Sequence, residues 1–185
     1  HGKSEFNFLS LPLWVHSKEC GIIARRVAFQ TGYHDPEEAF VAGVLHDIGK
    51  LAILMKSSEN FKNIQRHEQM FDSTSDQAEK VILGYTHMDI GGLLMKKWNM
   101  PESLYGCVYN HHTMTENQDR KSSLTDMVIL GNYYSHVLKL KTGMDSPEKP
   151  DDIKNLLVRL DLNDEDEASL IKNIREDLSH SELFD

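Results

Sequence analysis

The chain has 185 residues, of which 39% are hydrophobic, and its formal net charge at pH 7 is -9. This length fits one domain, or one domain with an extension, and the apolar content is sufficient for a core that needs no disulfide bonds. The sequence has neither a basic stripe nor a run of about 18 apolar residues, which excludes a nucleic-acid-binding surface and a transmembrane helix.

The acidic charge is concentrated at the C-terminal end of the chain. Residues 145–185 contain 13 acidic and 5 basic residues, whereas the rest of the chain is nearly neutral. We therefore expect a main domain at 13–144 and an acidic helical extension at 145–185 that packs on or flanks it. Residues 1–12 begin with HGKSEF and no Met, which is typical of a tag remnant or a fragment start.

The two cysteines, Cys20 and Cys107, are far apart in apolar segments. Isolated cysteines in such surroundings are usually buried, reduced thiols. No spacing suggests a disulfide framework or a CxxC zinc site. This cysteine usage favours a cytoplasmic protein.

Apolar residues recur with helical spacing along nearly the whole chain, and no segment alternates as a strand does. The sequence therefore predicts an all-α fold. The expected helices cover residues 13–31, 35–49, a short segment from 51, 59–71, 77–85, 86–98, 101–112, 123–140, 153–160 and 165–184.

The segment from Asp35 to Gly49 has the clearest helix boundaries. Asp35 is a good N-cap, Pro36 suits the first helical position, and the helix is expected to end near Gly49. His46 and Asp47 would then lie in the last turn of an apolar helix, where the negative end of the helix dipole favours a cation.

Five histidines share helix faces with apolar residues and are expected to point inward: His16, His46, His87, His111 and His112. One such histidine is more often a hydrogen-bonded core residue than a ligand. Several of them near one aspartate would satisfy their polar groups together by sharing a metal ion. Glu79 and Lys80, by contrast, are expected on a solvated helix face.

The donor types narrow the choice of metal. Neutral imidazoles with a carboxylate suit Fe, Mn, Zn, Co or Ni, and the absence of thiolates argues against a structural zinc finger. The two oxygens of Asp47 allow it to bridge two metal ions, as in two-metal hydrolytic sites.

Four phrases together resemble one family. They are HS at 16–17, AGVLHDIGKL at 42–51, GYTHMDIGGLLMKKWNMP at 84–101 and NHH at 110–112. In this order they resemble the HD superfamily, most closely its bacterial HDOD branch, the HD-related output domains. The resemblance implies an all-α HD-domain helical bundle that acts in signal transduction and is related to metal-dependent phosphohydrolases.

The resemblance also implies roles for individual residues. It assigns metal ligands to His16, His46, Asp47, His87, His111 and His112, with Asp47 bridging two divalent ions, of which Fe or Mn is favoured over Zn, Co or Ni. Asp47 and Lys50 would be the catalytic residues, with Lys50 near the phosphate or the metal-bound water.

The chain departs from its relatives in three places. The last ligand of the family is an Asp, but the matching phrase VILGN places Asn132 there; Asp126 on the same helix is a substitute candidate. After the paired histidines the chain continues TMTENQDRK, unlike the HD-GYP relatives that hydrolyse cyclic di-GMP. The N-terminal helical half of HDOD domains is also missing, so we expect the chain to be the C-terminal part of a larger protein.

Two functions remain open on the sequence. One is a phosphohydrolase acting on a phosphorylated small molecule or a nucleotide. The other is a non-catalytic output module that binds metal and signals through a regulatory protein partner or the missing N-terminal domain.

Overall fold

The computed structural model describes residues 2–113, 124–139 and 149–182. All regular secondary structure in these ranges is helical, which confirms the predicted all-α fold. The helices in chain order are α1 (Gly2–Thr31), α2 (Pro36–Leu45), α3 (Ile48–Lys56), α4 (Ser58–Phe71), α5 (Ser75–Leu83), α6 (His87–Lys97), α7 (Glu102–Asn110), α8 (Leu124–Lys139), α9 (Asp151–Arg159) and α10 (Asp164–Glu182). None of them is long and apolar enough to cross a membrane.

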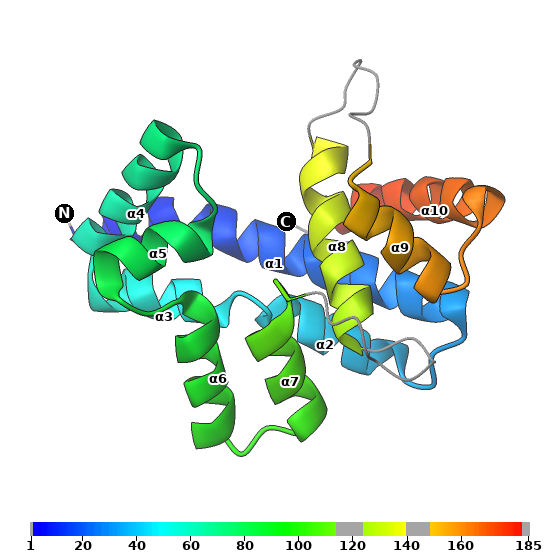
Figure 1. Ribbon diagram of the computed structural model, residues 1–185, viewed down its shortest axis with the longest axis horizontal. Coiled ribbons are helices and arrows are strands. Elements are labelled where there is room, and N and C mark those ends of the chain that lie inside the picture. The colour runs from blue at the N-terminus through cyan, green and yellow to red at the C-terminus, as the bar shows by residue number, and fades with distance from the viewer. Residues whose placement is uncertain (1, 114–123, 140–148, 183–185) are drawn as a thin grey trace. The chain divides into compact units, whose positions relative to one another are not determined.

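The helices form two compact units (Figure 1), the first made of residues 1–17 and 45–110, the second of residues 18–44 and 111–185. The first half of α1 belongs to the first unit and its second half to the second. Residues 2–12, expected to be a tag remnant or fragment start, are part of α1.

The first unit is built around α3. This helix packs against α4 and α6, while α5 covers α4 and α7 lies beside α6. Its core holds one cluster of buried apolar side chains, Ile53, Leu54, Phe61, Ile64 and Ala78, against which Phe6, Leu9, Leu13 and Leu83 pack. These side chains repeat at helical spacing in the sequence, so the same pattern that predicts the helices also forms this core.

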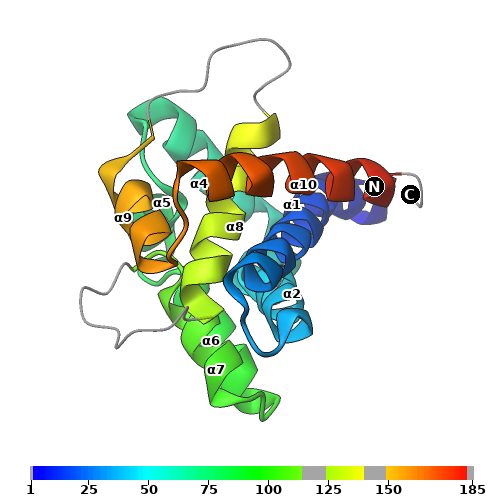
Figure 2. The ribbon, with the colours of Figure 1, turned by 90° about the vertical axis from the view of Figure 1, so that its right-hand side faces the viewer.

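In the second unit, the C-terminal helices gather beside the second half of α1 (Figure 2). Arg26 donates from Nε and Nη2 to the two carboxylate oxygens of Asp177 on α10, each at 2.6 Å. Gln30 donates to the carbonyl of Asp166 at 2.9 Å. The C-terminal helices also bury apolar side chains, among them Leu156 and Leu170. The described part of the acidic segment therefore contributes to the core of this unit.

The predicted helix from Asp35 to Gly49 is wrong at its C-terminal end. α2 stops at Leu45, His46 and Asp47 form a turn, and α3 begins at Ile48. Asp47 has φ -100° and ψ 16°, which lies outside the α-helical region. His46 and Asp47 therefore do not lie in a core helix, and Asp47 precedes the positive end of α3.

Candidate metal centre

The carboxylate of Asp47 is the focus of a polar cluster in the first unit. Asp47 is 5% exposed. The Nε2 atoms of His16 and His46 lie 3.7 Å and 3.4 Å from its Oδ2 atom, and the Nε2 atom of His87 lies 3.3 Å from its Oδ1 atom. The three imidazoles come from α1, the α2–α3 turn and the start of α6. Tertiary packing thus brings distant parts of the sequence to one carboxylate.

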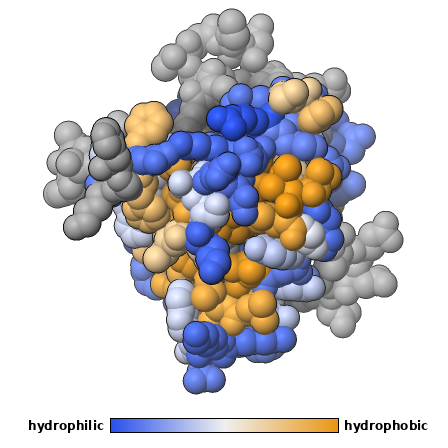
Figure 3. Space-filling view, turned by 90° about the vertical axis from the view of Figure 1, so that its left-hand side faces the viewer, coloured by the Kyte–Doolittle hydropathy of each residue, from blue (hydrophilic) through white to orange (hydrophobic). Residues whose placement is uncertain are grey.

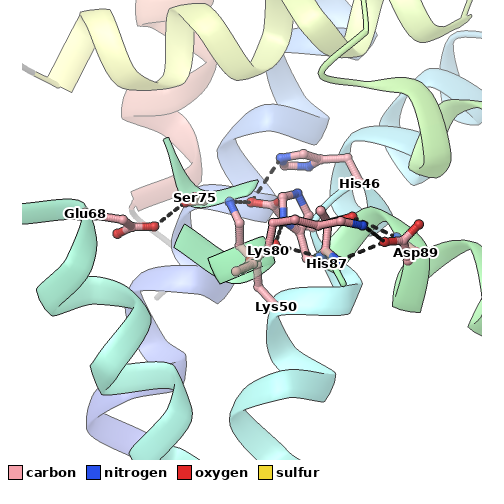
Figure 4. A network of polar contacts seen from close by, with 10 residues as sticks. His46, Lys50, Glu68, Ser75, Lys80, His87 and Asp89 are labelled. Atoms are coloured by element: carbon pink, nitrogen blue, oxygen red, sulfur yellow. Dashed lines mark hydrogen bonds and ion pairs between the residues drawn. The ribbon is translucent and has the colours of Figure 1, made fainter. Parts of the chain in front are cut away.

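Lys50 lies on the first turn of α3, three residues after Asp47. Its Nζ atom donates to Asp47 Oδ2 at 2.8 Å, and Figure 4 shows Lys50, His46 and His87 directed toward the same region. Burial lowers the pKa of Lys50, but the charge and hydrogen bond of Asp47 outweigh it, so the pKa lies above its ordinary value. Lys50 is therefore a protonated cation beside the carboxylate.

Glu79 on α5 fixes the orientation of His87. Its Oε2 atom accepts from the backbone N–H of His87 and contacts His87 Nδ1, both at 2.7 Å. An ionised Glu79 can only accept, so in that form the ring proton of His87 lies on Nδ1, which leaves the Nε2 lone pair toward Asp47. The expectation that Glu79 belongs to a solvated helix face is wrong, since Glu79 is only 2% exposed.

Burial is the main cause of the pKa shifts of His87 and Glu79. Burial, with the charge of Lys50, lowers the pKa of His87 to about 3, so its imidazole is neutral at pH 7. Burial raises the pKa of Glu79 to about 7, although the His87 amide and Lys50 both act to lower it. A neutral imidazole is the form that ligates a metal.

The arrangement fits a transition-metal ion. Two atoms bound to one ion at about 2.1 Å lie about 3.0–3.4 Å apart when the angle at the ion is tetrahedral or octahedral. The separation of 3.3 Å between His87 Nε2 and Asp47 Oδ1 falls in this range. Ligand atoms of His16, His46 and Asp47 also lie within 4.8 Å of one another. Carboxylate support of a ligating histidine, as Glu79 gives to His87, is typical of metal sites.

The remaining predicted ligands belong to the second unit, and their part in the centre stays a prediction. His111 is 1% exposed and its ring lies 4.3 Å from that of His112. Asn132 lies on α8, and its buried Oδ1 atom has no hydrogen-bond partner among the described residues. Asp126, the substitute candidate, accepts from Arg159 Nη2 of α9 at 2.6 Å, so its carboxylate forms an ion pair with that helix.

Comparison with known proteins identifies the family. The family model of the HDOD domain matches residues 2–114. This chain belongs to the HDOD domain family. The match confirms the resemblance carried by the phrases around His46 and His87.

Three solved structures have the same fold as this HDOD chain. An HDOD domain protein of unknown function from Geobacter sulfurreducens is 24% identical, with a TM-score of 0.71, over 90% of this chain and 60% of the other. A candidate phosphohydrolase from Shewanella amazonensis is 22% identical, with a TM-score of 0.66, over 88% and 58%. A candidate signal transduction protein from Marinobacter aquaeolei is 16% identical, with a TM-score of 0.67, over 90% and 37%.

These likenesses establish the fold alone, because identities below 25% do not carry a function from one protein to another. The chain spans about 60% of the first two proteins and 37% of the third. The chain therefore has the HDOD fold, and its described residues contain a His/Asp cluster of the kind that could hold a metal ion.

Proposed function

We propose that this HDOD domain binds divalent transition metal at Asp47, acts in signal transduction, and hydrolyses a phosphoester. The observation that carries the proposal is the convergence of three imidazole Nε2 atoms on one buried carboxylate, at 3.3–3.7 Å. Lys50 already balances the charge of this carboxylate, so it is the donor set that points to metal: imidazole nitrogens gathered at one carboxylate are ligands that transition metals prefer. The descriptions of two neighbouring structures, one a candidate phosphohydrolase and one a candidate signal transduction protein, support the two parts of the proposal.

His16, His46, His87 and Asp47 would hold the metal, which when bound supplies an acidified water and positive charge for a phosphate. In the full proposal His111, His112 and Asn132 complete the ligand set for two ions, with Fe or Mn favoured over Zn, Co or Ni. Glu79 holds His87 in the ligating tautomer through its 2.7 Å contact. The substrate class is a phosphorylated small molecule or a nucleotide.

Lys50 would bind the phosphate group of the substrate. It is the cation nearest to Asp47, at 2.8 Å, and an ammonium attracts phosphate oxygens as a point charge. By moving between the carboxylate and an incoming phosphate, its Nζ atom would stabilise negative charge that develops during hydrolysis.

A non-catalytic output module is the second candidate. It is favoured by Asn132, which places a neutral amide where the family has a carboxylate. An amide oxygen binds divalent metal less strongly than an anionic carboxylate. In this case metal would support the fold or a regulatory contact, and no phosphoester would be turned over.

The decisive experiment combines elemental analysis with a chromogenic phosphoester assay in the presence of Mn, Fe, Co or Ni. The proposal expects at least one bound transition metal and metal-dependent turnover. Asp47→Ala should remove most of the metal and cancel the increase in melting temperature that added metal gives the wild type, because a bound ion stabilises the folded state by mass action.

His67→Ala is the matched control, because His67 contacts Ser73 and lies outside the cluster around Asp47. Metal bound equally by wild type and Asp47→Ala would contradict the proposal. Metal binding without turnover of any phosphoester would favour the output module.

A further inference from the structure

Helix α3 is apolar on two opposite faces. One face buries Ile53 and Leu54 in the core of the first unit. On the opposite face, Ile48, Leu51, Ala52 and Met55 recur at helical spacing, and Met55 is 70% exposed. A surface helix of a protein that acts alone usually has a polar outer face, so the sequence of α3 indicates that its second face is covered in use.

Helix α6 supplies the other wall of an apolar groove. Leu94 of α6 and Trp98, the residue that follows α6, line an open hollow of about 520 Å³ together with the outer face of α3. Trp98 is 51% exposed. Figure 3 shows one side of the molecule, where hydrophobic residues gather in patches between hydrophilic ones.

The groove has one cationic residue in its lining and a second exposed lysine next to its lining in sequence. Lys56 is the charged residue in the lining, and Lys97, the last residue of α6, directly precedes Trp98. Both lysines are exposed, and neither has an ion pair with another residue of the described ranges. An occupant with acidic residues beside its apolar side chains would therefore match this surface.

We propose that the groove between α3 and α6 docks an amphipathic α-helix of a protein partner, with large apolar side chains facing Leu51, Met55 and Trp98 and with acidic side chains toward Lys56 and Lys97. A groove between two helices that is apolar along its floor is the surface that helix-in-groove recognition uses. A second copy of this chain is a poorer occupant, because a two-fold contact would bring the lysines of both copies to one interface. The proposal does not depend on metal binding or catalysis.

The test uses two synthetic helical peptides of 18 residues with the same Leu/Met stripe, one flanked by Glu and one by Lys. Each is labelled with fluorescein, and binding is measured by fluorescence anisotropy with EDTA present, so that the result is independent of the metal centre. We expect the Glu-flanked peptide to bind at least tenfold more tightly than the Lys-flanked peptide, and more weakly as salt is raised.

Variants then locate the site on the surface. Met55→Ala should weaken binding of the Glu-flanked peptide about tenfold, because truncating this side chain removes most of the apolar surface that it would bury against the peptide. The double variant Lys56→Glu with Lys97→Glu should reverse the preference between the two peptides. Met70→Ala and Lys172→Glu are matched controls, exposed outside the groove, and should change neither affinity.

Three outcomes would overturn the proposal. Equal binding of both peptides would show apolar adhesion without charge recognition. Binding unchanged by Met55→Ala and by the charge reversal would place the peptide elsewhere. A dimer in light scattering that Met55→Glu dissociates would assign the groove to a second copy.

Discussion

Glu79 holds His87 through one oxygen, because its Oε2 atom accepts from the backbone N–H of His87 and contacts ring Nδ1, both at 2.7 Å. Replacing it with Gln keeps the side-chain shape but removes the carboxylate that, when ionised, supports the ligating tautomer. We expect Glu79→Gln to lower metal affinity by about 10–100-fold, the range for lost carboxylate support of a ligating histidine. Isothermal titration with Co²⁺ measures this, with circular dichroism to verify folding. Lys80→Ala, one position along the same helix, should titrate like the wild type.

Lys50 and a metal ion compete for the same oxygen of Asp47, which Lys50 contacts at 2.8 Å. Lys50→Ala should therefore leave metal content at or above the wild-type level while weakening the binding of inorganic phosphate or the turnover of a phosphoester. Elemental analysis and a phosphate titration on the same preparation separate the two effects. A parallel loss of metal and phosphate would make Lys50 a structural residue instead.

At the level of helices, the contact between α3 and α6 depends on Gly49. A Cβ atom at this position would lie 1.9 Å from the backbone oxygen of His87. Because backbone on the far side cannot move aside as a flexible side chain can, Gly49→Ala should destabilise the protein by about 3 kcal/mol, the upper end for overpacking. It should also weaken metal binding, since α3 would shift Asp47 away from His87.

Gly106 on α7 offers the matched control in the same unit, because a Cβ atom there would meet nothing within 4 Å. Gly106→Ala should stabilise the protein by about 0.5–1 kcal/mol, the helix preference of Ala over Gly. Urea unfolding followed by circular dichroism measures both variants. Equal stability of the two would contradict the packing argument for Gly49.

At the level of the whole molecule, the role of Asn132 as a metal ligand remains a prediction. Asn132→Asp restores a carboxylate at the position where the family has one. The Oδ1 atom of Asn132 has no hydrogen-bond partner among the described residues, so the substitution breaks no hydrogen bond at this atom. We expect tighter Mn²⁺ binding and a gain of phosphoesterase activity. A titration with no change in affinity would show that α8 supplies no ligand.

A substitution of Asp126, which lies on the same helix, tests whether this residue is structural or a metal ligand. It is 4% exposed and accepts from Arg159 at 2.6 Å. Asp126→Ala should therefore cost about 1–3 kcal/mol of stability, less than a fully buried pair because Arg159 is partly exposed, while metal affinity stays unchanged. A loss of metal in this variant would restore Asp126 as the substitute ligand.

The all-α fold, the HDOD family and most helix positions could be predicted from the sequence alone, because helical periodicity and the HDIGK and THMDIGG phrases are local patterns. The sequence could not determine where the helix before Asp47 ends, since Gly49 is required by its approach to His87 and not by local capping alone. The sequence also could not show the role of Glu79, because its pattern with Lys80 is typical of an exposed helix face. Tertiary packing decided both, because only packing brings α5 against His87 and so turns an ordinary surface carboxylate into a buried hydrogen-bond acceptor.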